Sequence, residues 1–491
     1  MKLYKILFSI VFGVGGFLAQ EPLHFWPLGI FFIFYLFYTW DKYCATGNKI
    51  DKYTFIICWV VYAGGMCYWI SYFTLLALFG FLVLQGLFAY IFLVSTSKIY
   101  YKNFSVLIFA FTFIVFEFVL ANIPIFSFTW LNLATIPLDL KFLHNFARAG
   151  GGELLTFFFI LYSILIFKIL FLNKKRIISL TKSYLVYLLI IFTVITYLLG
   201  NTNFTNKINY KVSIVQGNNL NRYLTDDEID NNYLRKSHIE LAKKIKDNPD
   251  LIVFPESAFY EDPDDTSNGL LKDLTPIAKL SKSMMIFNSI TEDDQTNYYN
   301  TNEFYSRDMD FLGSYSKKRL VPFGEYVPFK NLLGSLSIFD DIGSGFSPGK
   351  KDFTINGITS LICFESTFSS DFRRALIPQT KLMVVTTNNR SYRRSGNSKQ
   401  HMAQSRLRAL EYSTPVVHAS VSGISAIIDK DGDVKSESKL FVNKLVQGGV
   451  DTTITRSFYS KTFDWFSYCA LVVVIWLIAF RLKDIKWKKT I

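Results

Sequence analysis

The chain has 491 residues, of which 51% are hydrophobic and 17% aromatic, and its mean hydropathy is +0.25. This balance is too apolar for an ordinary soluble protein and indicates one that is partly embedded in a membrane. The formal charge of +13 does not indicate a nucleic-acid partner, because no RNA- or DNA-binding motif accompanies it. The length allows two or three domains.

Eight apolar segments are candidate transmembrane helices, each of which needs about 20 mostly apolar residues. Seven precede residue 200, and one lies near the end of the chain. We expect them near residues 5–20, 24–40, 54–70, 73–95, 104–121, 153–172, 183–199 and 464–481. The first is not expected to be a cleaved signal peptide, because no small-x-small site closes it and further spans follow at once.

The distribution of Lys and Arg predicts the orientation of these spans. Basic residues gather before the first span, in alternate loops and after the last span, whereas the loops between them are poor in both. Because basic loops face the cytoplasm, we expect both termini to be cytoplasmic. The chain then divides into a seven-helix bundle at 1–200, an outward-facing domain at 201–462, and a last helix with a basic cytoplasmic tail at 463–491.

The outward-facing domain alternates short apolar runs with helical patterns, which is typical of the α/β class. The sequence favours an open sheet or stacked sheets. Helices are predicted near 228–246 and 399–412. Strands are predicted at 211–216, 251–254, 284–287, 299–305, 311–316, 358–362, 382–386, 416–420 and 425–429.

Three of these strands end at reactive side chains: Glu256, Lys317 and Cys363. Taken singly, a Cys is most often a small buried hydrophobe, and a Glu or a Lys is more often a turn or solvated residue. Together the three can perform acyl transfer. A thiolate attacks a carbonyl to form a thioester, a carboxylate carries the proton, and an ammonium lowers the thiol pKa and stabilises the oxyanion.

The segments around these residues resemble the nitrilase superfamily of carbon–nitrogen hydrolases. They are Val253-Phe-Pro-Glu256, the stretch from Lys317 to Pro328, and Ile362-Cys-Phe-Glu365. Within the second, the block Leu320-Val-Pro-Phe-Gly-Glu-Tyr-Val-Pro328 closely resembles the apolipoprotein N-acyltransferases of Gram-negative bacteria. That resemblance covers essentially the whole chain. It implies a multi-pass bundle of about eight helices and a nitrilase-like αββα sandwich.

The resemblance also implies a reaction and its catalytic residues. Glu256 corresponds to the family's base, Lys317 to its oxyanion stabiliser and Cys363 to its nucleophile. A phospholipid is the acyl donor, and the N-terminal amine of a diacylglyceryl-apolipoprotein is the acceptor. Both lie in the bilayer of the bacterial inner membrane, with the catalytic domain periplasmic. No cofactor, metal or nucleic acid takes part. The alternatives are a membrane-anchored amidase or hydrolase and a degenerate homologue that binds lipids or lipoproteins.

Three more residues match supporting positions of the family's active site: Glu325, Phe364 and Glu365. Phe364 stands where the family commonly has Tyr. The segment Thr387-Asn-Asn-Arg-Ser391 stands where the family usually reads Thr-Asn-Asp-x-Trp, so Asn389 replaces an Asp and the Trp is missing. Arginines make residues 389–394 basic. This loop either favours anionic lipid head groups or is a solvated surface loop.

Overall fold

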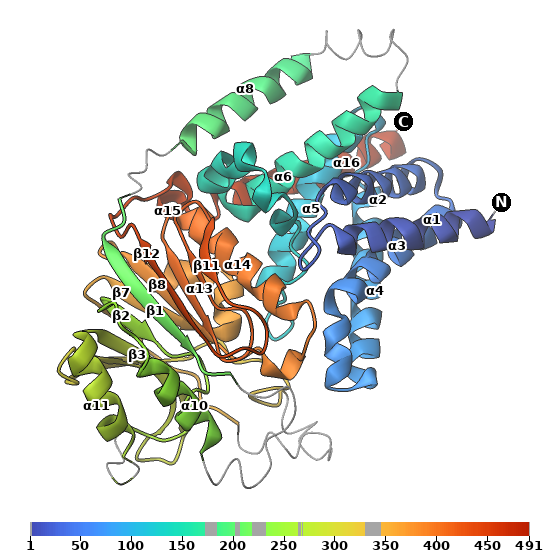
Figure 1. Ribbon diagram of the computed structural model, residues 1–491. Coiled ribbons are helices and arrows are strands. Elements are labelled where there is room, and N and C mark those ends of the chain that lie inside the picture. The colour runs from blue at the N-terminus through green and yellow to red at the C-terminus, as the bar shows by residue number, and fades with distance from the viewer. Residues whose placement is uncertain are drawn as a thin grey trace. The chain divides into compact units, whose positions relative to one another are not determined.

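The computed structural model describes residues 2–171, 184–201, 207–218, 232–263, 267, 269–328 and 345–490. The chain forms two compact units, drawn as ribbons in Figure 1. Unit 1 comprises Met1–Thr202 and Ser457–Ile491, and unit 2 comprises Asn203–Arg456.

Unit 1 is helical. Its α-helices are α1 (Lys2–Leu18), α2 (Pro27–Thr46), α3 (Lys49–Cys67), α4 (Leu75–Ser97), α5 (Ser105–Asn122), α6 (His144–Phe171), α8 (Tyr184–Leu199), α15 (Phe458–Thr462) and α16 (Trp465–Thr490). Among the described residues, five helical segments are long and apolar enough to cross a membrane. They are Lys49–Tyr72, Leu75–Ser97, Lys102–Asn122, Lys141–Leu170 and Trp465–Leu482. Two apolar helices, Leu3–Leu18 and Leu189–Leu199, are shorter. A membrane bundle is therefore supported, whereas the expected count of eight spans is not confirmed.

Unit 2 contains two six-stranded sheets with the orders β12-β1-β2-β3-β4-β5 and β11-β10-β9-β8-β7-β6. The first has the strands β1 (Tyr210–Gln216), β2 (Leu251–Val253), β3 (Met284–Glu292), β4 (Tyr298–Tyr305), β5 (Phe311–Ser316) and β12 (Lys444–Val450). The second has β6 (Thr354–Ile355), β7 (Ile358–Ile362), β8 (Leu382–Thr387), β9 (Val416–Ser420), β10 (Ala426–Ile428) and β11 (Val434–Glu437). In each sheet three neighbouring strands are parallel: β1, β2 and β3, and β7, β8 and β9.

Helices cover the outer face of each sheet, which gives the layers α–β–β–α. Helices α10 (Tyr233–Ala242) and α11 (Leu270–Ser281) share a buried apolar cluster with β1, β2 and β3. Helix α13 (Ser369–Ala375) contacts β7, and α14 (Asn397–Tyr412) contacts β9 and β10. The two sheets contact each other through β1 with β9 and β10 with β12. Parallel strands covered on both sides are apolar along their whole length, and β7 and β8 are fully buried.

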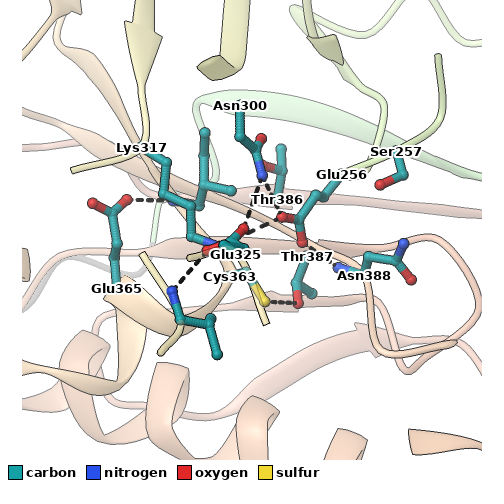
Figure 2. A network of polar contacts seen from close by, with 12 residues as sticks. Glu256, Ser257, Asn300, Lys317, Glu325, Cys363, Glu365, Thr386, Thr387 and Asn388 are labelled. Carbon is teal, nitrogen blue, oxygen red and sulfur yellow. Dashed lines mark hydrogen bonds and ion pairs between the residues drawn. The ribbon is translucent and has the colours of Figure 1, made fainter. Parts of the chain in front are cut away.

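The predicted strands and the helix near 399–412 are confirmed, with shifts of a few residues at their ends. The other predicted helix, 228–246, is found as α10, which ends at Ala242, so the predicted last turn at 243–246 is not α-helical. Its first residues, 228–231, lie outside the described residues. The sequence prediction missed β6, β11, β12, α11 and α13. The segments that follow β2, β5 and β7 bring the three predicted catalytic residues into one network (Figure 2).

Candidate active site

Glu256 follows β2 and is held by two hydrogen bonds. Its side chain is buried, with 7% of its surface exposed. The Asn300 side-chain amide donates to Oε1 over 2.7 Å, and the Asn388 backbone N–H donates to Oε2 over 2.6 Å. Each carboxylate oxygen therefore has a fixed donor, and the carboxylate is oriented before any substrate arrives (Figure 2).

Lys317 directly follows β5 and lies between two carboxylates. Its Nζ is 2.7 Å from Glu325 Oε1 and 3.7 Å from Glu256 Oε1, and its side chain is 1% exposed. Burial by itself lowers the pKa of this amine, but the charges of Glu325 and Glu256 outweigh burial and raise the pKa above its ordinary value. Lys317 is thus a permanent cation that links both carboxylates.

Cys363 follows β7 in a conformation that L-residues rarely adopt. Its φ is +52°, and such strain at a non-glycine residue is typically kept at functional sites. The thiol is half-buried, and the Thr387 hydroxyl donates to Sγ over 3.2 Å. Burial raises the pKa of the thiol to about 12, and Glu256 adds to this, whereas Lys317 and the Thr387 hydrogen bond oppose it. The resting group is therefore a thiol, which needs a base to become a nucleophile.

Glu365 is fully buried, and both of its carboxylate oxygens accept hydrogen bonds from other residues of the protein. Oε1 accepts hydrogen bonds from the Tyr315 hydroxyl at 2.8 Å and from the backbone N–H groups of Lys318 at 2.9 Å and Arg319 at 3.1 Å. Oε2 accepts one from the Ile362 N–H at 2.9 Å. Glu365 therefore ties the segment after β5, which carries Lys317, to the end of β7, which carries Cys363.

The other predicted supporting residues take different positions. Glu325 pairs with Lys317 and accepts the Val321 N–H over 2.8 Å, which closes its own loop. Phe364 is half-buried, and its ring packs edge-on against Phe368 with 4.9 Å between the ring centroids.

Asn300 and Thr387 contact the catalytic groups but were not predicted as site residues. Asn300 lies inside β4, where Asn288 donates to its Oδ1 over 2.7 Å. An Asn in a buried strand position is a weak signal of a function, because buried polar groups need specific partners. Among the residues that the structure describes, no group of three or more His, Cys, Asp or Glu side chains is placed to hold a metal ion.

Comparison with protein families extends these observations. The family model for carbon–nitrogen hydrolases matches residues 211–458, which is more than half of the chain. The chain belongs to the carbon–nitrogen hydrolase family. In addition, residues 12–165 match the model described as the apolipoprotein N-acyltransferase N-terminal domain.

Several curated proteins named apolipoprotein N-acyltransferase are similar to this chain. Apolipoprotein N-acyltransferase of Wigglesworthia glossinidia brevipalpis is 30% identical over 285 residues, a match that spans 56% of each chain. The protein of that name from Haemophilus influenzae is 26% identical over 477 residues, which cover 90% of this chain and 88% of the relative. Among solved structures, an amidase from Nesterenkonia sp. is similar at 15% identity and a TM-score of 0.38, over 52% of this chain and 93% of that one. The relatives and the five apolar helices together support a membrane protein.

Proposed function

We propose that the protein transfers an acyl chain from a phospholipid, through a thioester on Cys363, to the N-terminal amine of a diacylglyceryl-modified apolipoprotein. The observation that carries the proposal is the meeting of Glu256, Lys317 and Cys363 at one edge of the two sheets. The match of residues 12–165 to the N-terminal domain of apolipoprotein N-acyltransferases supports substrates that reside in a bilayer.

In the first half-reaction, Glu256 takes the thiol proton as Sγ attacks the ester carbonyl of the phospholipid. Negative charge develops on the carbonyl oxygen, and the Lys317 ammonium stabilises it. When the ester C–O bond breaks, Glu256 returns the proton to the departing oxygen. A lysophospholipid leaves, and the acyl group remains on Cys363 as a thioester.

In the second half-reaction, the neutral amine of the lipoprotein attacks the thioester carbonyl. Glu256 takes a proton from the amine, and Lys317 again stabilises the oxyanion. The C–S bond breaks, the proton passes to sulfur, and an amide is formed. The two products leave in separate steps, so the scheme is ping-pong.

We propose the orientation that the basic loops predict. Residues 1–200 and 463–491 supply eight spans of the inner membrane, both termini are cytoplasmic, and residues 201–462 are periplasmic. A reporter enzyme that is active only outside the cytoplasm should work when fused after residue 201 and fail when fused after residue 491. The reverse result would overturn the orientation.

The chemistry is tested by incubating the purified full-length protein with phospholipid labelled in its acyl chain. The label should appear on the Cys363 peptide, hydroxylamine should release it, and Cys363→Ala should carry none. Absence of label would refute the proposal and favour a homologue that only binds lipid. Equal label on the variant would refute Cys363 as the acylated residue.

Adding a diacylated lipopeptide then distinguishes transfer from hydrolysis. Transfer predicts that the label moves to the peptide amine. The membership in the carbon–nitrogen hydrolase family keeps a membrane-anchored hydrolase as the second candidate, in which water resolves the thioester. Release of the label as free fatty acid alone would favour that candidate.

A further inference from the structure

A buried histidine contacts the backbone carbonyl of Cys363. His401 lies on α14, which packs against the short 3-10 helix η7 (Cys363–Thr367), and it is 1% exposed. Its Nε2 is 3.0 Å from the Cys363 carbonyl oxygen and 2.9 Å from Ser366 Oγ. The Ser366 hydroxyl donates to the same carbonyl over 2.8 Å. Two donors therefore hold the carbonyl of a residue whose φ is +52°.

The neighbours of the ring determine which nitrogen carries the hydrogen. The Cys363 carbonyl can only accept, so Nε2 must donate. On the other side, Asn389 Nδ2 lies 3.2 Å from Nδ1 and can only donate, so Nδ1 must accept. The orientation of the Asn389 amide follows from its other bonds, since Oδ1 accepts from Ser420 Oγ and Nδ2 donates to Asn397 Oδ1, both over 3.1 Å. This assignment of the hydrogens makes His401 a neutral ring with its hydrogen on Nε2.

This tautomer affects Thr387, whose hydroxyl has one hydrogen and competing acceptors. Thr387 Oγ1 is 3.2 Å from Cys363 Sγ, 3.3 Å from His401 Nδ1 and 3.4 Å from Asn389 Oδ1. Nδ1 has a single lone pair, and the Asn389 amide occupies it. Asn389 Oδ1 is farther from Oγ1 than the sulfur is, and it already accepts from Ser420 Oγ. The hydroxyl hydrogen is therefore available to the sulfur, where a hydrogen bond is worth most when the sulfur is an anion.

We propose that His401 is a positioning residue for the nucleophile. As the neutral Nε2–H tautomer set by Asn389, it holds the Cys363 carbonyl and leaves the Thr387 hydroxyl to stabilise the thiolate. Asn389 stands where the resemblance leads one to expect an Asp, whose carboxylate could only accept a hydrogen bond. A negative charge there would draw a hydrogen onto Nδ1 and compete with sulfur for the Thr387 hydroxyl.

The inference rests on the proposed function for the identity of the nucleophile, but its test needs neither acyl substrate. The rate at which iodoacetamide alkylates Cys363 in the full-length protein follows the thiolate fraction at any pH below the thiol pKa. Mass spectrometry of the Cys363 peptide separates this reaction from that of the exposed Cys469. Failure of this test therefore differs from failure of acyl transfer.

Four variants separate positioning from general packing. Thr387→Val should alkylate about tenfold more slowly, since a hydrogen bond to a charged group is worth about one pKa unit. His401→Leu should be slowed at least as much. His401→Gln, whose amide nitrogen reaches the place of Nε2, should stay within about threefold of the parent protein because it keeps the donor to Cys363. His418→Leu is the matched control, because His418 is buried beside His401 but its Nδ1 contacts Ser405 instead of the site.

The pattern of rates decides the matter. The proposal is overturned if Thr387→Val alkylates at the parental rate, or if His401→Gln is as slow as His401→Leu. It is equally overturned if His418→Leu is slowed as much as His401→Leu, because loss of packing would then explain both. Selective ¹⁵N labelling of the five histidines adds a direct readout, in which His401 should show a neutral ring protonated at Nε2 at pH 7. A ring protonated at Nδ1, or at both nitrogens, would contradict the assignment.

Discussion

The two sheets of unit 2 supply different kinds of group to the site. The sheet containing β2, β4 and β5 supplies charges, namely Glu256 and Lys317, and Lys317 pairs with Glu325 in the following loop. The sheet containing β7 and β8 supplies the sulfur of Cys363, which is held by the neutral groups of Thr387 and of His401 on α14. In the proposed mechanism, the first half moves protons and stabilises charge, whereas the second fixes the position of the sulfur.

This division has an electrostatic reason. The charged half holds two carboxylates and one ammonium, so its formal charge is negative, and Glu256 and Glu325 both raise the pKa of the Cys363 thiol. A further carboxylate near sulfur would oppose thiolate formation still more. Neutral donors stabilise a thiolate without adding negative charge. Asn389, in place of an Asp, fits this requirement.

The largest effect is expected when the charged half loses its cation. Lys317→Met leaves the buried Glu256 and the half-buried Glu325 without a counter-charge, which should cost about 3–5 kcal/mol of unfolding free energy and abolish acyl transfer. Thermal unfolding in detergent and the labelled-phospholipid assay measure the two effects. Lys430→Met is the matched control, because Lys430 is a buried lysine paired with Asp451 over 2.9 Å in the same unit. It should lose stability but keep transfer, and loss of transfer there would show that instability alone removes activity.

Glu256→Gln tests the proton-transfer role of the charged half. The amide keeps the size of the side chain but cannot accept the thiol proton, so thioester formation should slow by about 10²–10⁴-fold. Glu261→Gln changes a nearby carboxylate that pairs with Arg235 over 3.1 Å, and it should leave the rate unchanged. If Glu256→Gln formed the thioester at the parental rate, another residue would have to be the base.

Glu365→Gln tests the connection between the two halves. The NH₂ group of the new glutamine would replace an oxygen that now accepts backbone N–H groups. Donors would then face donors, at a cost of about 1–3 kcal/mol of unfolding free energy. Because Glu365 connects the segment that carries Lys317 to the end of β7, the change should shift Lys317 relative to Cys363. Acyl transfer should therefore also fall by roughly tenfold. Unchanged transfer per folded molecule would make Glu365 a purely structural residue.

The sequence predicted the residues that follow strands better than their partners inside strands, for a physical reason. Glu256 and Cys363 follow short apolar runs and Lys317 follows a predicted hairpin, and such patterns identify strands. The contact from Asn300 to Glu256 joins residues 44 apart in the chain, and no local pattern reports it. Strand β12 was missed because Gly448 and Gly449 weaken its strand pattern. A Cβ on Gly449 would lie 2.2 Å from Ile208 Cγ2, so a larger residue there would displace the Ile208 side chain.

The smallest predicted effect concerns the pH dependence of stability in the neutral half. Burial lowers the pKa of His401 to about 4, from an ordinary value of 6.5. The unfolded chain therefore binds more protons than the folded one as the pH falls through 6.5. The contribution of neutral His401 to the free energy of unfolding is complete well above that pH and is lost as the pH falls towards 4. Between pH 7 and pH 6 this amounts to about 0.7 kcal/mol.

His401→Gln removes the titrating group but keeps the donor to Cys363, so its stability should fall less than that of the parent protein over this interval. The buried His238 and His418 are common to both proteins and cancel in the difference. Chemical denaturation at the two pH values measures it. Equal losses in the two proteins would mean that His401 is protonated to the same extent folded and unfolded. The Asn389 amide could then not be donating to Nδ1, and the neutral half would carry a positive charge next to the nucleophile.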